Sequence, residues 1–160
     1  MTSDSADRSW LDSVTFEAMT QFDLAGVLRI ERISFPTAWT PESYLREIHN
    51  VNSYYMVARY QGTVVGYAGM WVIQDEAHVS TIAVAPEYRR RGLGEALMRH
   101  LMVTARSRHA ILMTLEVREH NLIAQTLYRK LGFQTHSFLP HYYGDTGENA
   151  YVMRRELGEG

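Results

Sequence analysis

The first stretch of the sequence that could do chemistry is a run of three arginines that leads into two glycines. Arg89, Arg90 and Arg91 precede Gly92 and Gly94. A helix begins with unpaired backbone N–H groups and a partial positive charge, and glycines leave those groups open to a ligand. The stretch therefore predicts either a cradle for phosphate groups or a glycine-started helix beside a solvated basic patch.

Two common phosphate-binding motifs fit this stretch poorly. A P-loop requires a Lys-Ser/Thr pair after its second glycine, and Glu95 and Ala96 follow Gly94. A dinucleotide-binding turn needs a third glycine near Leu97. Glu116 nevertheless lies at about the spacing at which such a turn has its ribose-binding acid. The P-loop is excluded, and a dinucleotide site stays open as a weaker alternative.

Three further polar side chains occupy positions where chemistry and plain structure compete. Glu116 interrupts an apolar strand pattern at residues 115–117, and strand alternation alone favours a solvent-facing carboxylate. Tyr128 has helical spacing with apolar neighbours, which alone favours a core position. Asn121 fits the N-cap of the helix that follows it. The residues alone therefore assign none of the three to catalysis.

The composition of the 160 residues is that of a globular protein. The formal net charge is −2, with 46% hydrophobic and 21% charged residues, so no nucleic-acid or membrane partner is expected. The absence of cysteine excludes disulfides, thiolate metal sites and a cysteine nucleophile. The seven histidines show no paired ligand spacing, so no metal is expected. We expect a cytoplasmic protein with a flexible tail over residues 1–12 and one domain over residues 13–157.

The elements that must position these residues follow from hydrophobic periodicity and turn signals. Strands are predicted over residues 14–19, 53–59, 63–73, 77–85, 111–117, 133–138 and 150–155. Helices are predicted over residues 20–34, from residue 41, and over residues 93–106 and 122–130. This order indicates an α+β fold built around a mixed sheet.

Three consecutive segments resemble the GCN5-related N-acetyltransferase (GNAT) family. "HVSTIAVAPEYRRRGLGEAL" contains the family's R/Q-x-x-G-x-G/A pattern, and "TLEVREHN" and "AQTLYRKLGF" follow in the family's order. The resemblance covers roughly residues 78–134. It implies a mostly antiparallel sheet of about seven strands with helices on both faces. It also implies that acyl-CoA lies where two neighbouring parallel strands splay apart.

The resemblance also implies roles for individual residues. Glu116 matches the general base, Tyr128 matches the general acid that protonates the leaving thiolate, and Asn121 matches a ligand of the cofactor. Acetyl-CoA, the co-substrate, would be bound by a strand end and the glycine loop after it: Ile82, Ala83, Val84, Arg89, Arg90, Arg91, Gly92, Leu93, Gly94, Glu95 and Ala96. Aromatic loops would bind the acceptor peptide: Phe35, Pro36, Trp39, Tyr142 and Tyr143.

"FPTAW" and "HYYGDTGENAYVM" resemble the subgroup that acetylates protein N-termini, which includes the ribosomal-protein-alanine N-acetyltransferases. The resemblance implies transfer of an acetyl group from acetyl-CoA to the α-amine of a protein, such as a ribosomal protein that starts with Ala. The enzyme is expected to be a monomer or a weak homodimer. An α-amine has a pKa of about 7.7–8.0 against about 10.4 for lysine, so a single carboxylate suits it as a base.

Three alternatives stay open at this point. The acceptor could be a lysine or a small-molecule amine, or the domain could bind acetyl-CoA without turnover. The loop aromatics could instead form a small cluster that closes the edge of the sheet. Asn149 stands where the subgroup usually has Asp, which leaves open whether this position affects substrate choice. His120 is expected to be a solvated loop residue.

Overall fold

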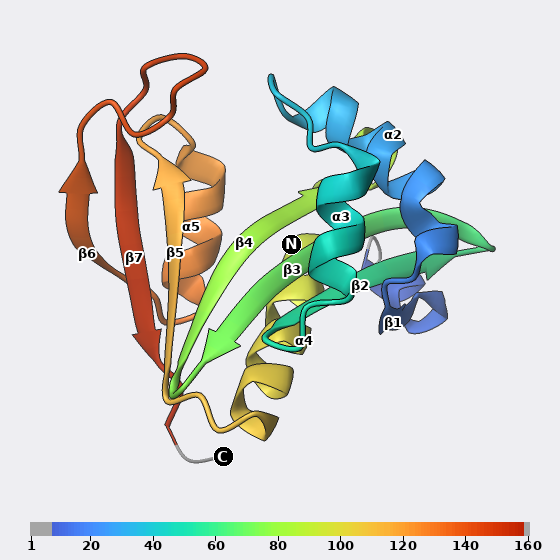
Figure 1. Cartoon of the computed structure of the whole chain (residues 1–160), viewed down its shortest axis with the longest axis horizontal. Coiled ribbons are helices and arrows are strands. Elements are labelled where there is room, and N and C mark those ends of the chain that lie inside the picture. The colour runs from blue at the N-terminus through green and yellow to red at the C-terminus, as the bar shows by residue number, and fades with distance from the viewer. Residues whose placement is uncertain (1–7, 159–160) are drawn as a thin grey trace. The chain divides into compact units, whose positions relative to one another are not determined.

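The computed structural model describes residues 8–158, which form two compact units. Unit 1 contains residues 8–70 and Thr81–Leu101, and unit 2 contains Trp71–Ser80 and residues 102–158. Three elements contribute to both units: strands β3 (Thr63–Ile73) and β4 (Glu76–Val84) and helix α4 (Leu93–Ser107). Figure 1 shows β3, β4 and α4 near the centre of the view.

The order of the elements confirms the order predicted from the sequence. The remaining strands are β1 (Thr15–Ala18), β2 (Ser53–Tyr60), β5 (Leu112–Arg118), β6 (Gln134–Leu139) and β7 (Ala150–Glu156). The remaining α-helices are α2 (Leu24–Ser34), α3 (Pro41–Ile48) and α5 (Leu122–Lys130). Three short 3₁₀ helices are η1 (Ser9–Ser13), η2 (Gln21–Asp23) and η3 (Pro86–Tyr88).

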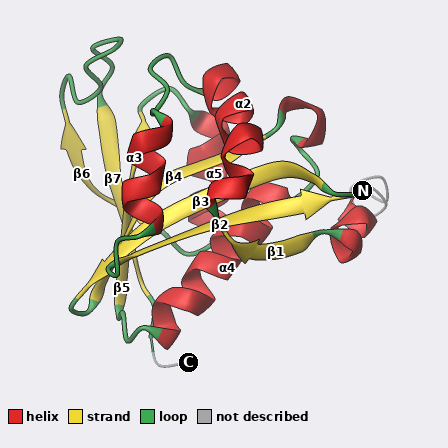
Figure 2. Ribbon diagram, turned by 45° about the vertical axis from the view of Figure 1, so that its right-hand side comes forward, coloured by secondary structure: helices red, strands yellow, loops and turns green. Residues whose placement is uncertain are grey.

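The strands form the expected mixed sheet of seven strands, in the order β1-β2-β3-β4-β5-β7-β6 (Figure 2). β1 pairs with β2 in antiparallel orientation, as β7 does with both β5 and β6. β4 and β5 are parallel, and their register joins residues 76–78 to residues 112–114. This short parallel pairing places His78 opposite Thr114.

The helices of unit 1 begin where side chains cap their free N–H groups. Thr20 accepts a hydrogen bond from the N–H of Phe22, and Asp23 accepts one from the N–H of Thr20, which completes a capping box. Thr40 caps α3 by accepting a hydrogen bond from the N–H of Ser43 (3.2 Å), and Pro41 follows it at the first helical position. Both helix starts were expected from the sequence.

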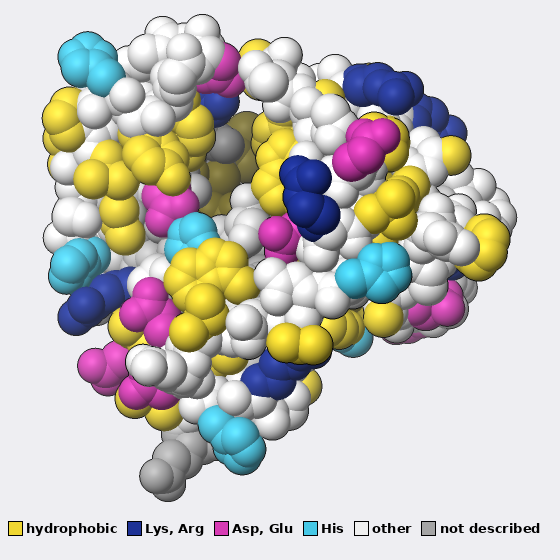
Figure 3. All heavy atoms as spheres, viewed as in Figure 1, with side chains coloured by type: hydrophobic (Ala, Val, Ile, Leu, Met, Phe, Trp, Pro, Cys, Tyr) yellow, Lys and Arg dark blue, Asp and Glu magenta, His cyan; other side chains and the backbone are white. Residues whose placement is uncertain are grey.

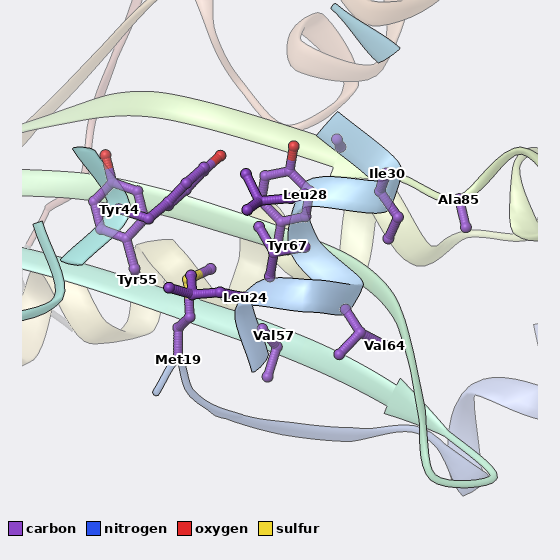
Figure 4. Close-up of a cluster of buried hydrophobic side chains, with 12 residues drawn as sticks. Met19, Leu24, Leu28, Ile30, Tyr44, Tyr55, Val57, Val64, Tyr67 and Ala85 are labelled. Atoms are coloured by element: carbon purple, nitrogen blue, oxygen red, sulfur yellow. The ribbon is translucent and has the colours of Figure 1, made fainter. Parts of the chain in front are cut away.

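Unit 1 buries side chains against both faces of its strands. A Cβ on Gly66 would lie 3.0 Å from Leu93 of α4, whereas the next residue, Tyr67, belongs to the cluster formed with α2 and α3. Neighbouring strand residues point to opposite faces, so α4 lies on the other face from α2 and α3. Figure 4 shows the cluster formed with α2 and α3, which contains Met19, Leu24, Val27, Leu28, Ile30, Tyr44, Tyr55, Val57, Val64, Tyr67, Ala83 and Ala85.

Unit 2 places helix α5 after the buried strand β5. Asn121 caps this helix through a hydrogen bond from the N–H of Ala124 (3.1 Å), as expected. The helix ends at Lys130, and Gly132, just beyond the C-cap Leu131, has a φ of +96° that favours glycine. A Cβ at this position would also lie 2.7 Å from Nε of Arg155. The glycine therefore allows both the turn and the close approach of a neighbouring side chain.

The last residues of the predicted N-terminal tail form a short helix instead. Residues 1–7 of the expected tail lie outside the described part of the chain, but Ser9–Ser13 form η1. The reason is packing, because Trp10 stacks on Tyr88 with ring centroids 5.1 Å apart. Within residues 8–158, no helix is long and apolar enough to cross a membrane.

Candidate active site

The glycine loop of unit 1 contains two residues in the left-handed region of backbone conformation. Arg90 and Gly92 both have positive φ values, 65° and 88°. The N–H of Ala96 makes the first hydrogen bond of α4, to the carbonyl of Gly92 (3.1 Å). The N–H groups that precede Ala96 in the first turn are thus outside the helical hydrogen-bond ladder. Such a turn can hold phosphate oxygens with backbone groups alone.

Two of the three exposed arginines in this loop also contact other residues of unit 1. Nε of Arg89 donates to the carbonyl of Val84 (2.9 Å), and its Nη2 donates to Oγ of Ser34 (3.2 Å). The guanidinium of Arg91 lies over the rings of Trp10 and Tyr88. The sequence predicted that all three side chains bind phosphates, and in the structure Arg89 and Arg91 also make contacts that fix the loop. All three side chains remain exposed.

The strand before the loop provides the backbone expected to face acyl-CoA. Ala83 is buried, whereas Ile82 and Val84 are partly exposed. The carbonyl of Val84 accepts from Nε of Arg89, and the N–H of Val84 is the backbone group of this residue that could donate to a thioester oxygen. Leu93 is buried in the core, and Glu95 forms ion pairs with Arg8 and Arg99.

The carboxylate of Glu116 in unit 2 is held by two neighbouring side chains. Nε2 of His78 lies 2.8 and 2.9 Å from the two carboxylate oxygens, and the hydroxyl of Tyr142 donates to one of them (3.3 Å). The side chains of Glu116 and His78 are 19% and 20% exposed. The carboxylate is thus half-buried and oriented, which differs from the solvated carboxylate that strand alternation favours.

His78 is a residue that the sequence did not identify. It lies on β4 opposite Thr114, two residues before Glu116 on β5, so both side chains lie on the same face of the sheet. The ring of Trp71 packs against His78 with centroids 4.9 Å apart, and Nδ1 of His78 is buried without a partner among the described residues. The parallel register brings His78 to Glu116, and no local motif indicates that register.

The surface of unit 2 combines hydrophobic, acidic and histidine side chains. Hydrophobic, acidic and histidine side chains lie side by side over β5, β6 and β7, on the left of Figure 3. Large hydrophobic side chains that remain exposed include Phe138 (46%) and Tyr142 (47%). A face of this composition can contact both apolar and charged groups of a ligand.

Tyr128 is buried in unit 2, as its helical spacing indicated. It is 7% exposed, and its ring packs edge-on against Phe133 with centroids 5.9 Å apart. Burial, together with the nearby Tyr143, raises the pKa of Tyr128 to about 12. Burial likewise raises the pKa of Tyr143 to about 12. Both hydroxyls therefore keep their protons at neutral pH and can act as hydrogen-bond donors.

Arg118 holds the loop of residues 140–149, which carries Tyr142 and Tyr143. Its guanidinium lies 3.9 Å from the centroid of Tyr143, 2.9 Å from Oδ2 of Asp145 and 3.4 Å from Oε1 of Glu148. The hydrogen bond from Arg118 lowers the pKa of Asp145. The pKa of Glu148 is lowered mainly by the backbone N–H of His120 and also by Arg118. The aromatic pair is thus fixed from β5 by one cation.

Asn149 makes two hydrogen bonds that together require an amide side chain. Its Nδ2 donates to Oε2 of Glu119 (2.8 Å), and its Oδ1 accepts from the N–H of His141 (2.9 Å). An aspartate could accept from His141 but could not donate to Glu119. His120 is 81% exposed and contacts Glu148, in line with a solvated loop residue.

The expected peptide-binding residues of unit 1 lie at the edge of its core. Phe35 packs against the cluster of buried side chains, and Trp39 is 37% exposed with its ring 5.0 Å from that of Tyr44. Pro36 is exposed. Among the described residues, no group of three or more His, Asp or Glu side chains could hold a metal ion.

Comparison with known proteins identifies the family. The model of the Acetyltransferase (GNAT) family matches residues 24–133. A Mycobacterium tuberculosis protein, N-alpha-acetyltransferase RimI, is 37% identical over 92% of this chain and 96% of its own length. The Escherichia coli [ribosomal protein bS18]-alanine N-acetyltransferase is 30% identical over 87% of this chain and 95% of its own.

A solved structure shows the same fold. The crystal structure of the ribosomal-protein-S18-alanine N-acetyltransferase from Escherichia coli matches with a TM-score of 0.84 and 29% identity, over 92% of this chain and 96% of that one. The glycine loop lies within the region that the family model covers. The chain belongs to the Acetyltransferase (GNAT) family and is an acetyl-CoA-dependent N-acetyltransferase.

Proposed function

We propose that this enzyme acetylates the N-terminal α-amine of a protein, and that a ribosomal protein beginning with Ala is its natural substrate. The observation that carries the proposal is the similarity to the two relatives named above, which extends over most of each chain. One of them is named for the N-terminal α-amine, and the other for the alanine of ribosomal protein bS18. The half-buried carboxylate and the buried tyrosine of unit 2 supply groups that such a reaction needs.

The glycine loop would bind the pyrophosphate of acetyl-CoA through its backbone. The positive φ values at Arg90 and Gly92 and the position of this loop at the N-terminus of α4 support this role. The side chains of Arg89, Arg90 and Arg91 are exposed and would add positive charge for the phosphates of CoA. Ile82, Ala83 and Val84 would pair with the pantetheine arm as an added strand would, and Asn121 would contribute a hydrogen bond.

Glu116 would act as the general base that removes a proton from the attacking amine. Acyl transfer requires a neutral amine, and an α-amine near its pKa needs only modest help from a base. The contacts of His78 and Tyr142 support this role because they fix the carboxylate while leaving it partly exposed. An ionised carboxylate only accepts hydrogen bonds, so Nε2 of His78 carries the hydrogen.

Tyr128 would act as the general acid for the leaving thiolate. Attack on the thioester forms a C–N bond, and the C–S bond then breaks to release the CoA sulfur, which takes a proton. A tyrosine whose pKa is about 12 is fully protonated at neutral pH, so the proton is present when the thiolate forms. The N–H of Val84 would stabilise the thioester oxygen as negative charge develops on it.

The acceptor peptide would contact Phe35, Pro36, Trp39, Tyr142 and Tyr143. Their partial exposure supports this role, because half-buried loop aromatics offer an apolar surface to a ligand. Tyr142 would also link peptide binding to the base, because its hydroxyl donates a hydrogen bond to Glu116. The same hydrogen bond and the burial of its ring raise the pKa of Tyr142, so it remains a donor at neutral pH.

The test is acetyl transfer from labelled acetyl-CoA to two matched peptides. One peptide has a free N-terminal Ala, and the other is blocked at its N-terminus but carries an internal lysine. We expect transfer to the free N-terminus alone, detected by mass spectrometry of the peptides. Transfer to the lysine would instead assign a side-chain acceptor, and binding without transfer to either peptide would contradict the proposed substrate class.

A further inference from the structure

We propose that Trp10 is a positioning residue for acetyl-CoA, because it holds the glycine loop in the shape that binds the pyrophosphate. The proposal rests on the proposed phosphate-binding role of that loop. Trp10 lies on η1, before the first strand and far from the family motifs in the sequence. Trp10 and the loop both belong to unit 1.

The indole of Trp10 contacts the loop at its most constrained point. Nε1 donates a hydrogen bond to the carbonyl of Arg91 (3.2 Å), which lies between Arg90 and Gly92. Both of these neighbours have positive φ values. A left-handed conformation is unfavourable for an arginine, so the contacts around it must maintain it. The hydrogen bond fixes the peptide group that separates the two left-handed residues.

Aromatic packing fixes the same residue from its side chain. The ring of Trp10 stacks on Tyr88 (5.1 Å, 24°) and meets the edge of Tyr60 (5.2 Å). The guanidinium of Arg91 lies 5.6 Å from the centroid of Trp10 and 5.7 Å from that of Tyr88. Cations at such distances are attracted to the faces of aromatic rings. Arg91 is therefore held through both its carbonyl and its guanidinium.

The residues beside Trp10 pack on the next part of the loop. Nη1 of Arg8 forms an ion pair with Oε1 of Glu95 (3.3 Å) in the first turn of α4. A Cβ on Gly92 would lie 3.2 Å from Cδ1 of Leu11 and 3.3 Å from Cγ of Arg8. Residues 8–11 thus lie directly against Gly92 and leave no room for a larger side chain. Residues 8–13 form a brace along the loop.

A brace of this kind should increase the affinity for the cofactor. A loop that must adopt two left-handed residues on binding loses affinity through the ordering of its backbone. A loop that is already held in that shape avoids this loss of affinity. The contribution of Trp10 should therefore appear in acetyl-CoA binding and not in peptide binding or in the chemical step.

The experiment is direct titration of acetyl-CoA by calorimetry into the full chain and two variants. Trp10→Phe keeps the ring stacking and loses the N–H donor, whereas Trp10→Ala loses both. We expect the Kd of acetyl-CoA to rise about threefold in Trp10→Phe and about tenfold in Trp10→Ala, as for loss of one hydrogen bond and then of the packing. Phe22→Ala, an 86% exposed aromatic of the same unit, is the matched control and should leave the Kd unchanged.

Steady-state kinetics separate positioning from a general structural effect. The KM of acetyl-CoA should rise with the Kd, while the KM of the peptide and kcat at saturating acetyl-CoA stay at the wild-type values. An unchanged Kd in both variants overturns the proposal, as does a peptide KM that rises in step. If Trp10→Ala fails to fold, Trp10→Phe decides. Titration involves no acceptor, so a wrong acceptor assignment leaves this result intact, whereas a wild type that fails to bind acetyl-CoA overturns the loop's role and this proposal together.

Discussion

Glu116 and Tyr128 are assigned the two proton transfers of the reaction, and single substitutions should separate these transfers from binding. Glu116→Gln keeps the size of the side chain but removes the base, and Tyr128→Phe removes only a hydroxyl. Each should lower kcat by about 10²-fold or more, since positioned acids and bases contribute about 10²–10⁴-fold. The KM of acetyl-CoA should not change. Steady-state kinetics with a free-N-terminal peptide measures both constants.

The matched control for the tyrosine variant is Tyr151→Phe. Tyr151 lies on β7 opposite Val117 and packs against Phe138 with ring centroids 5.6 Å apart, so its side chain points to the other face of the sheet from Glu116. This variant should retain the wild-type kcat. A wild-type kcat in Glu116→Gln would remove the base role, and one in Tyr128→Phe would remove the acid role.

Asn149 and Glu119 form a second pair that substitution can test. Asn149→Asp places a carboxylate 2.8 Å from another one, so the free energy of unfolding should fall by about 1–2 kcal/mol. Glu119→Gln in the same chain restores a donor between the two positions and should recover most of the loss. Urea unfolding of the two single variants and the double variant measures the coupling. Additive effects in the double variant would show that the pair does not interact.

The sequence could identify residues that belong to motifs but not residues that meet through the register. Glu116, Tyr128 and Asn121 lie in segments that resemble the family, so they could be named in advance. His78 could not, because it approaches Glu116 only through the parallel pairing of β4 with β5. Arg89 shows the same limit, since one of its partners, Ser34, is distant in the sequence.

At the scale of elements, a buried carboxylate connects α2 to the segment between α2 and α3. Glu31 is 3% exposed and accepts hydrogen bonds from the hydroxyls of Tyr44 (2.7 Å) and Tyr67 and from the N–H of Trp39 (3.0 Å). Figure 4 shows the tyrosine hydroxyls on one side of the cluster. Burial and the contact with Glu31 raise the pKa values of Tyr44 and Tyr67, so both remain donors.

Removal of this carboxylate should destabilise unit 1 and release the segment that carries Trp39. Glu31→Ala leaves two buried hydroxyls and a backbone N–H without their acceptor, which should lower the free energy of unfolding by about 3 kcal/mol. The KM of the peptide should rise more than that of acetyl-CoA. Urea unfolding and kinetics measure these effects, and Glu42→Ala, at an exposed position of α3, is the control. Equal stability of the two variants would contradict the role of Glu31.

The loop of residues 140–149 should loosen at acidic pH. The pKa values of Asp145 and Glu148 are lowered in the folded chain, so their contacts with Arg118 contribute at neutral pH. That contribution begins to decline below the ordinary carboxylate pKa of about 4 and is lost as the pH falls through the lowered values. Amide hydrogen exchange of the loop, corrected for intrinsic rates, should speed up over this range. Arg118→Gln should exchange fast at every pH, and a pH-independent wild type would contradict the argument.

The elements themselves could be predicted more fully than the loops between them. Thr20, Thr40 and Asn121 each cap a helix start where the sequence indicated one, because capping depends on residues within one turn. The conformation of residues 140–149 depends on Arg118 of another element, so no local pattern indicates it. Helix η1 was missed for the same reason, since it is held by Tyr88 and Arg91.

At the scale of the whole molecule, the family assignment follows from segments that are spread along the chain. The presence of a parallel pair and the class of enzyme could be predicted because three motifs occur together in one order, whereas the order of the strands in the sheet was not predicted. The division into two compact units could not, because β3, β4 and α4 contribute to both units without any break in their periodicity. The identity of the acceptor is inferred from the similar proteins named above.

Ligand-dependent stability tests the cofactor assignment for the entire chain. A ligand present at 100 times its Kd stabilises the folded state by about 2.7 kcal/mol. For a chain of this length, each kcal/mol raises Tm by about 2–4 °C, so acetyl-CoA should raise Tm by about 5–10 °C. NAD at the same concentration should leave Tm unchanged, because Leu97 stands where a dinucleotide turn needs glycine. Thermal unfolding followed by circular dichroism measures both shifts, and a rise with NAD alone would reinstate the dinucleotide site.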